Sequence, residues 1–176
     1  MRPFCKVVAL EIFFLVVSGF HPGALAQSLP GSKALAGLCQ KAGFIFAGTV
    51  LAVERGEPPS GNHGVATMRV TFRVDDAIRG VQSGQTFVLR EWAGLWGTEK
   101  RYWPGERLVV FLYPVSRLGL TSPVGGAAGR FPMDRNGNVL LSSGRGQTGA
   151  ANPHVRKAAP VSGSEFAGAI RRVQEE

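Results

Sequence analysis

The chain has 176 residues, of which 44% are hydrophobic, and its formal net charge is +8. This length suffices for one domain with a real core. Only two cysteines are present, Cys5 and Cys39, which excludes a disulfide-rich scaffold. The 24 glycines fall between short apolar runs, a pattern typical of many short strands joined by tight turns.

Residues 1–26 have the layout of a secretory signal peptide. A positively charged start precedes a mostly apolar run, and the small residues Ala24 and Ala26 stand where a signal peptidase reads. The run is too short for a comfortable membrane span, which needs about 20 apolar residues. We therefore expect a secreted or periplasmic protein cleaved after Ala26, the alternative being an uncleaved N-terminal anchor. Cleavage would leave Cys39 without a partner for an internal disulfide.

The remaining sequence predicts one mainly β domain with a helix at either side. The expected segments are a lead-in with a short helix (27–42), a β domain (43–142), a loose polar linker (143–162) and a C-terminal helix (163–176). Gly43 would end the first helix. Ser162 or Ser164 would cap the second, which would dock through Phe166 and Ile170 because these lie at helical spacing.

Apolar patterning within the β domain predicts five or six short antiparallel strands. Residues 44–54 and 106–114 are apolar on both alternating sets, as in strands buried on both faces. Residues 67–75 alternate, as in a strand with one wet face. Gly48 suggests a bend or bulge, and Asn136–Gly137 suits a two-residue hairpin turn. Together these features favour a small closed or nearly closed barrel.

Three short motifs resemble the secreted barrel domains related to tissue inhibitors of metalloproteinases and netrin modules. They are Gly48-x-Val50 after an apolar start, Arg79–Gly80 at the end of a long strand, and Pro104–Gly105–Glu106 before an apolar strand. The resemblance covers about residues 40 to 142 and implies an OB-like barrel. The animal inhibitors begin with a disulfide-locked cysteine that grips the protease zinc, whereas the expected mature start here is Gln27. The resemblance therefore implies the fold and not the inhibitory wedge.

Catalytic and metal-binding motifs are not evident in the sequence. His63, His154 and Cys39 are far apart and lack the close spacing of zinc ligands, so we expect no metal and no cofactor. Neither a nucleophile elbow nor a phosphate-binding loop is present. The glutamates that flank the aromatic loop are Glu91, Glu99 and Glu106. We expect a non-catalytic binding or interaction domain, with a protease inhibitor and an envelope hydrolase using these glutamates as alternatives.

The basic charge bears on the class of partner. Arg69 and Arg73 lie on the wet face of the strand over 67–75, and Arg79 and Arg90 are candidates for the same surface. Proteins that bind single-stranded nucleic acid also present aromatic rings on which bases stack, and threonines and an aspartate occupy the neighbouring positions here. We therefore expect a protein or an anionic cell-envelope polymer as partner, no nucleic acid, and no stable membrane span after cleavage.

All three tryptophans lie in one short stretch between the predicted strands. Trp103, or Tyr102 beside it, is expected to close one end of the barrel. Trp96 has two open interpretations, because it either folds back over the barrel mouth or projects from a binding loop. The predicted binding residues are Trp92, Leu95 and Trp96, rimmed by Arg90, Lys100 and Arg101.

Overall fold

A computed structural model describes residues 32–56, 65–96, 101–141 and 160–175. In chain order, its elements are α1 (Ser32–Lys41), β1 (Phe44–Gly56), β2 (Thr67–Arg79), β3 (Thr86–Trp92), η1 (Ala93–Leu95), β4 (Arg107–Leu112), η2 (Gly126–Gly129), β5 (Arg130–Pro132), β6 (Asn138–Val139), β7 (Val161–Ser162) and α2 (Gly163–Glu175). The predicted signal peptide and most of the predicted linker lie outside the described residues. None of the helices in the described part of the chain is long and apolar enough to cross a membrane.

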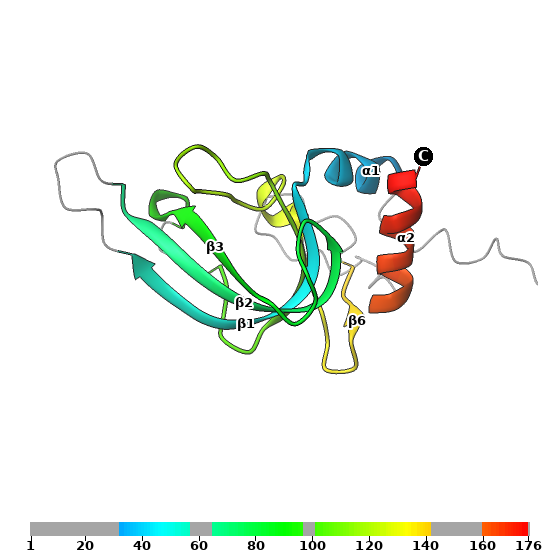
Figure 1. Cartoon of the computed structure of the whole chain (residues 1–176). Helices are drawn as coiled ribbons and strands as arrows, with labels where there is room; N and C mark the ends of the chain where they lie inside the picture. The colour runs from blue at the N-terminus through cyan, green and yellow to red at the C-terminus, as the bar shows by residue number, and fades with distance from the viewer. Residues whose placement is uncertain (1–31, 57–64, 97–100, 142–159, 176) are drawn as a thin grey trace, which may run out of the picture.

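Five strands form one antiparallel sheet in the order β3-β2-β1-β4-β5, and β6 pairs with β7 in a second, two-stranded sheet (Figure 1). The predicted mainly β fold with two helices is therefore confirmed. The closed barrel is not found in the described residues. After β4 the chain makes an isolated bridge between Leu112 and Pro123, a hydrogen bond from Val124 N to Phe111 O of β4 (2.8 Å), and one from Thr121 N to Arg90 O of β3 (2.9 Å). Because Pro114 and Pro123 have no N–H to donate, this segment cannot extend a continuous ladder.

The sheet buries both of its faces around β1 and β4. We call inner the face whose side chains form one apolar cluster: Phe46, Val50, Val70, Phe72, Val74, Leu89, Leu108, Val110 and Leu112, with Trp96 and Tyr102 from the connection between β3 and β4. On the outer face, Ile45 and Phe111 pack against Leu35 of α1 and against Phe166 and Ile170 of α2. Helices α1 and α2 lie together at one end of the sheet (Figure 1). The prediction that these two strands are buried on both faces is confirmed for β4 and for the first half of β1, but it is wrong for β1 beyond Val50, where Leu51 is 48% exposed.

The predicted bend in β1 lies at Gly48. The pairing of β1 with β2 shifts register at three places, one of them between Ala47 and Gly48. A Cβ on Gly48 would lie 2.7 Å from the carbonyl oxygen of Arg73, so only glycine lets the two strands approach this closely. The bend allows the long strand β1 to pair with β2 over almost its whole length and with β4 over its first half.

The Arg79–Gly80 motif fastens the end of β2 to the end of α1. The Arg79 guanidinium donates to the carbonyl oxygens of Cys39 (2.6 Å) and Ala42 (3.1 Å), which lie where the helix ends. This places a cation where a helix has unpaired carbonyls and a partial negative charge. Gly43 follows the helix as predicted, but its φ is not positive; glycine is needed there because a Cβ would lie 2.8 Å from the Cα of Pro114.

The Pro104–Gly105–Glu106 motif is a turn docked on β1. Gly105 has a φ of +84°, which favours glycine, and Pro104 precedes it as in a type II turn. Gly105 N donates to Val50 O (2.8 Å), and Val50 N donates to Glu106 O (2.9 Å). The first and third motifs of the resemblance therefore meet through two backbone hydrogen bonds.

The C-terminal part of the described chain confirms one predicted helix and corrects its surroundings. Phe166 and Ile170 of α2 are fully buried, as expected. Ser162 and Glu165 form a reciprocal cap, because Glu165 N donates to Ser162 Oγ (3.2 Å) and Ser162 N to Glu165 Oε2 (3.3 Å). The predicted linker is wrong at Val161 and Ser162, which pair with β6.

The hairpin at Asp134–Asn138 forms, but with a longer turn than predicted. Asp134 N donates to Asn138 O (2.8 Å), so three residues connect the paired positions. Only Gly137 in this turn has a positive φ (+82°). The Asp134 carboxylate accepts hydrogen bonds from Asn136 N and Asn138 N, both at 2.8 Å, which accounts for the different turn.

Candidate functional site

Strand β3 sends successive side chains to opposite faces of the sheet. Glu91 stands opposite Met68 on the inner face and is 0% exposed. Arg90 and Trp92 lie on the outer face, and Trp92 is 50% exposed. A buried carboxylate and an exposed indole are therefore neighbours in the chain, and they define two different candidate sites on the two faces.

The buried tryptophan of the stretch is Trp96. The chain turns through η1 after β3, which leaves Trp96 only 7% exposed against the inner cluster. Its ring centroid lies 5.8 Å from that of Tyr102, which is 1% exposed. Trp103 is 50% exposed, so Tyr102 closes this end of the inner cluster and Trp103 does not. Of the two interpretations of Trp96, the structure shows the one in which it folds back over the core.

The Glu91 carboxylate joins the segments on either side of η1. Its Oε2 accepts a hydrogen bond of 2.6 Å from Trp96 Nε1 and an ion-paired contact of 3.4 Å from Arg101. Arg130 reaches the same region from β5, with its guanidinium carbon 4.6 Å from the centroid of the Tyr102 ring. These five residues form what we call the Glu91 cluster.

The Glu91 cluster is electrostatically unusual because part of it has no partner. Within the described residues, Glu91 Oε1, the Tyr102 hydroxyl and Arg130 Nε are buried and make no hydrogen bond. Burial raises the pKa of Glu91, against the opposing effects of Arg101, the Trp96 hydrogen bond and Arg130. Burial, and secondly the nearby Glu91 charge, also raise the pKa of Tyr102. At Glu91 the effect of burial therefore outweighs that of the nearby cations and of the Trp96 hydrogen bond, and it favours the protonated carboxyl.

Two of the three glutamates that flank the aromatic loop, Glu91 and Glu106, make hydrogen bonds within the fold. Glu91 holds Trp96 and Arg101 in place beneath the surface. Glu106 accepts a hydrogen bond from Trp103 N (3.1 Å) and so fixes the turn before β4. Glu99 lies outside the described residues. Among the residues that the structure describes, no group of three or more His, Cys, Asp and Glu side chains is placed to hold a metal ion.

The exposed members of the predicted binding set gather at the end of β3. Trp92 and Leu95 are 50% and 51% exposed, and Arg90 is exposed two positions before Trp92 on the same face. The Trp92 ring lies over Gly94, where an added Cβ would be 2.5 Å from the indole. Trp92, Leu95 and Arg90 are the part of the predicted set that the structure leaves accessible, and we call them the outer patch.

The other members of the predicted set have different surroundings. Trp96 is buried, and the half-buried Arg101 is engaged with Glu91. Lys100 lies outside the described residues. Reasoning from the sequence missed the Glu91 cluster, although a signal was present: in a strand with a period of two, Glu91 shares its face with the buried Leu89.

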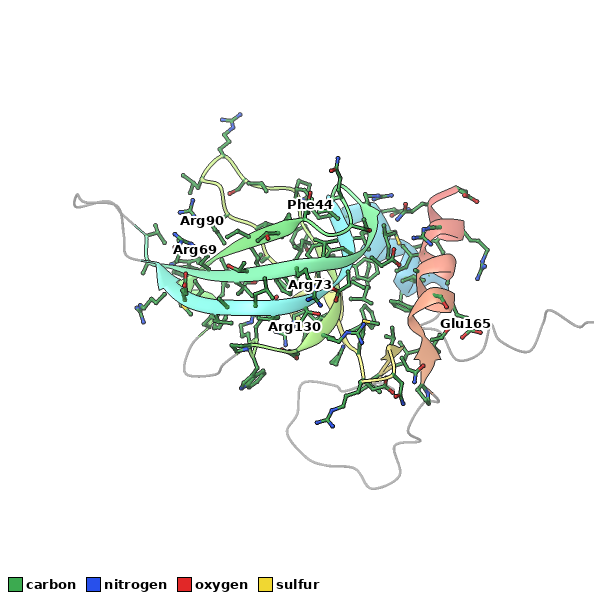
Figure 2. The ribbon with its side chains drawn as sticks, turned by 60° about the horizontal axis from the view of Figure 1, so that its bottom comes forward. Phe44, Arg69, Arg73, Arg90, Arg130 and Glu165 are labelled. Carbon is green, nitrogen blue, oxygen red and sulfur yellow. The ribbon has the colours of Figure 1, made fainter. Side chains whose placement is uncertain are left out.

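Two of the arginines that the sequence assigns to one surface, Arg69 and Arg90, are paired on the outer face. Arg69 of β2 stands directly opposite Arg90 of β3 in the antiparallel register. Figure 2 shows these two arginines together near one end of the sheet, with Arg73 further along β2.

No protein-family model, curated protein or solved structure matches the chain.

Proposed function

We propose that the chain is an exported, non-catalytic binding domain with an OB-like fold, and that it contacts its partner through the outer patch. The observation that carries this proposal is the 50% exposure of Trp92, one residue after a fully buried glutamate. An indole ring is a large apolar area to leave in water, and tryptophan and arginine are the residues most enriched at binding hot spots.

Two residues near the outer patch are held in place by hydrogen bonds, which supports a role in binding. Trp96 and Arg101 are both bonded to the buried Glu91 carboxylate. A contact surface that is held rigidly before binding loses less conformational entropy when it binds. The fold therefore holds Trp96 and Arg101 in place while it leaves Trp92 and Leu95 accessible.

The OB-like part of the proposal is supported by the pairing of the strands. The bent strand β1 lies between β2 and β4, and the chain after β4 bonds to both β4 and β3. A sheet of five strands that curls over one apolar cluster is typical of small, partly open barrels. The same pairing joins the Gly48-x-Val50 and Pro104–Gly105–Glu106 motifs on which the resemblance rests.

A co-sedimentation assay with cell-envelope fraction tests this function. We expect the purified protein to sediment with the envelope, and Trp92→Ala and Leu95→Ser to reduce the bound fraction strongly. Leu140→Ser is the matched control, because Leu140 is also exposed but follows β6 in the other sheet. Equal binding by all the variants would contradict the proposed surface.

Two further measurements address catalysis and export. Panels of hydrolase substrates and of proteases should show neither turnover nor inhibition, and turnover that is lost in Glu91→Gln or Glu106→Gln would overturn the proposal. Mass spectrometry of the mature protein should find Gln27 as its first residue. A chain that begins at Met1 in a membrane fraction would contradict export with cleavage.

A further inference from the structure

We propose that the outer face of β2 and β3 binds an anionic polysaccharide. Arg69 and Arg90 would contact its carboxylate or phosphate groups, and Trp92 would stack against a sugar ring. This inference rests on the proposed function, because it names the ligand class of the same end of β3.

The first observation is the pairing of two like charges. Arg69 and Arg90 face each other across adjacent antiparallel strands, where side chains of opposite residues lie close. Like charges directly opposite each other destabilise a sheet, so this pair contributes nothing favourable to folding by itself. An anionic group of another molecule that bound between the two arginines would offset their repulsion.

The second observation is that little in the described part of the chain neutralises the charge of this pair. The contact between Arg69 and Glu54 is long, at 3.7 Å, and both side chains are more than half exposed. An exposed ion pair of this kind is worth little. The Arg90 side chain makes no ion pair or hydrogen bond to any described residue, and it extends toward Gly119, where an added Cβ would lie 3.6 Å from the guanidinium.

Two other arginines of β2 provide an internal contrast. Arg73 is bonded to Asp75 (2.9 Å) on its own strand, and Arg79 is committed to the carbonyls at the end of α1. Among the described residues, Arg73 and Arg79 therefore have hydrogen-bond acceptors within the fold, whereas Arg69 and Arg90 on the outer face have none (Figure 2).

The chemistry of the three residues favours an anionic glycan. A guanidinium binds carboxylate and phosphate groups through two parallel hydrogen bonds. Trp92 lies two residues beyond Arg90 on the same face, which is roughly 7 Å along the strand. An indole at this distance can cover the apolar face of a sugar ring while the arginines hold its neighbour's anionic group.

Nucleic acid fits this face less well. Binding of single strands uses several aromatic side chains on which successive bases stack. Besides Trp92, the outer positions of β2 and β3 that pair around the arginines are Thr67, Thr71 and Val88. One aromatic ring beside two arginines suits a chain of sugars with spaced charges better than a run of bases.

Affinity measurements with defined polymers test the inference. We expect the protein to bind sodium alginate, a polyuronate, in a salt-dependent way and not to bind neutral dextran. Arg69→Gln/Arg90→Gln should weaken alginate binding about tenfold or more, since hydrogen bonds to charged groups are lost, and Trp92→Ala should also weaken it. The control Arg135→Gln/Arg172→Gln removes the same charge at exposed positions on the β5–β6 turn and on α2, and should bind within about twofold of the parent.

Several results would overturn the inference. Equal weakening by both double variants would show attraction by net charge alone, and tighter binding of oligo(dT) than of alginate would favour nucleic acid. If alginate does not bind, but Trp92→Ala still abolishes sedimentation with the envelope, the proposed function stands and the ligand class is wrong. If neither measurement depends on these residues, both proposals are wrong. Unchanged unfolding midpoints of the variants would confirm that these results do not reflect misfolding.

Discussion

A charged residue and a tryptophan lie on each side of the sheet at β3, but the inner pair is buried and the outer pair is exposed. On the inner side, Glu91 and Trp96 are bonded to each other and are almost inaccessible to water. On the outer side, Arg90 and Trp92 are exposed and, within the described residues, neither side chain is hydrogen-bonded. The surroundings of a charged or aromatic residue in this stretch therefore depend on the side of the sheet on which it lies, and the residue type alone does not predict them.

The largest expected effect that tests this comparison is that of Trp96→Ala. Removal of this buried ring should cost about 3–5 kcal/mol of unfolding free energy, as for other large aromatic side chains in cores. Chemical denaturation with urea would measure the loss. A cost below about 1 kcal/mol would mean that Trp96 is no part of the core and that the comparison is wrong.

The hydrogen bond of Trp96 can be separated from its packing. Trp96→Phe keeps most of the ring but removes the N–H that donates to Glu91 Oε2. We expect it to cost about 1–3 kcal/mol, because a buried carboxylate oxygen loses a donor. If Trp96→Phe is as stable as the parent protein, the Glu91 cluster does not depend on this bond.

The arginines of β2 allow a second, smaller contrast in stability. Arg79→Gln should cost about 1.5–3 kcal/mol, since it removes charged hydrogen bonds to the end of α1. Arg69→Gln should change the unfolding free energy by about 0.5 kcal/mol or less, because the one ion pair that Arg69 makes with a described residue is exposed. Thermal unfolding of both variants under the same conditions would test this. Equal losses of stability would contradict the contrast between Arg79, which is bonded to the end of α1, and Arg69, which is exposed.

The effect of Glu91→Gln should depend on pH. Burial raises the pKa of Glu91 in the folded protein, so folding favours its protonated form. The associated stability is fully present below the ordinary glutamate pKa of about 4.3 and is lost as the pH rises through the raised value. The difference in unfolding free energy between Glu91→Gln and the parent should therefore shift in favour of the variant as the pH rises. A difference that is constant between pH 4 and pH 8, or that shifts the other way, would show that the burial of Glu91 is fully compensated.

The smallest expected effect is that of Trp92→Ala. An exposed side chain away from structural features changes stability by about 0.5 kcal/mol or less, so this variant should unfold with nearly the midpoint of the parent. Its comparison with Trp96→Ala under identical conditions is the most direct test of the two faces. If both variants lose several kcal/mol, Trp92 is part of the core and the outer patch has no anchor.

The sequence predicts much of the fold because the strongest patterns are local. Alternation identifies the wet face of β2, and runs of consecutive apolar residues identify β4 and the first half of β1 as buried on both sides. Helical spacing identifies Phe166 and Ile170 as the docked side of α2. Each of these patterns reflects burial of one short segment, which the sequence records directly.

The candidate site is harder to predict because it depends on contacts between segments. Alternation puts Glu91 on the inner face, but only the return of the chain after η1 brings Trp96 Nε1 and Arg101 to its carboxylate. The exposed and buried members of the Tyr102–Trp103 pair differ by one position, and no pattern in the sequence decides between them. The pairing of Arg69 with Arg90 likewise follows from the register of β2 and β3, which the sequence does not state.

The packing of α1 against α2 has a consequence for how the chain folds. Leu35 and Cys39 share one apolar cluster with Phe166 and Ile170, although the whole sheet lies between them in the sequence. A helix of ten residues is marginal in water when it stands alone. Neither helix should therefore persist before the sheet has formed and brought the two together, and closing so long a loop slows folding. The backbone amides of α1 should consequently be protected from exchange with solvent only while α2 and the sheet remain packed against it.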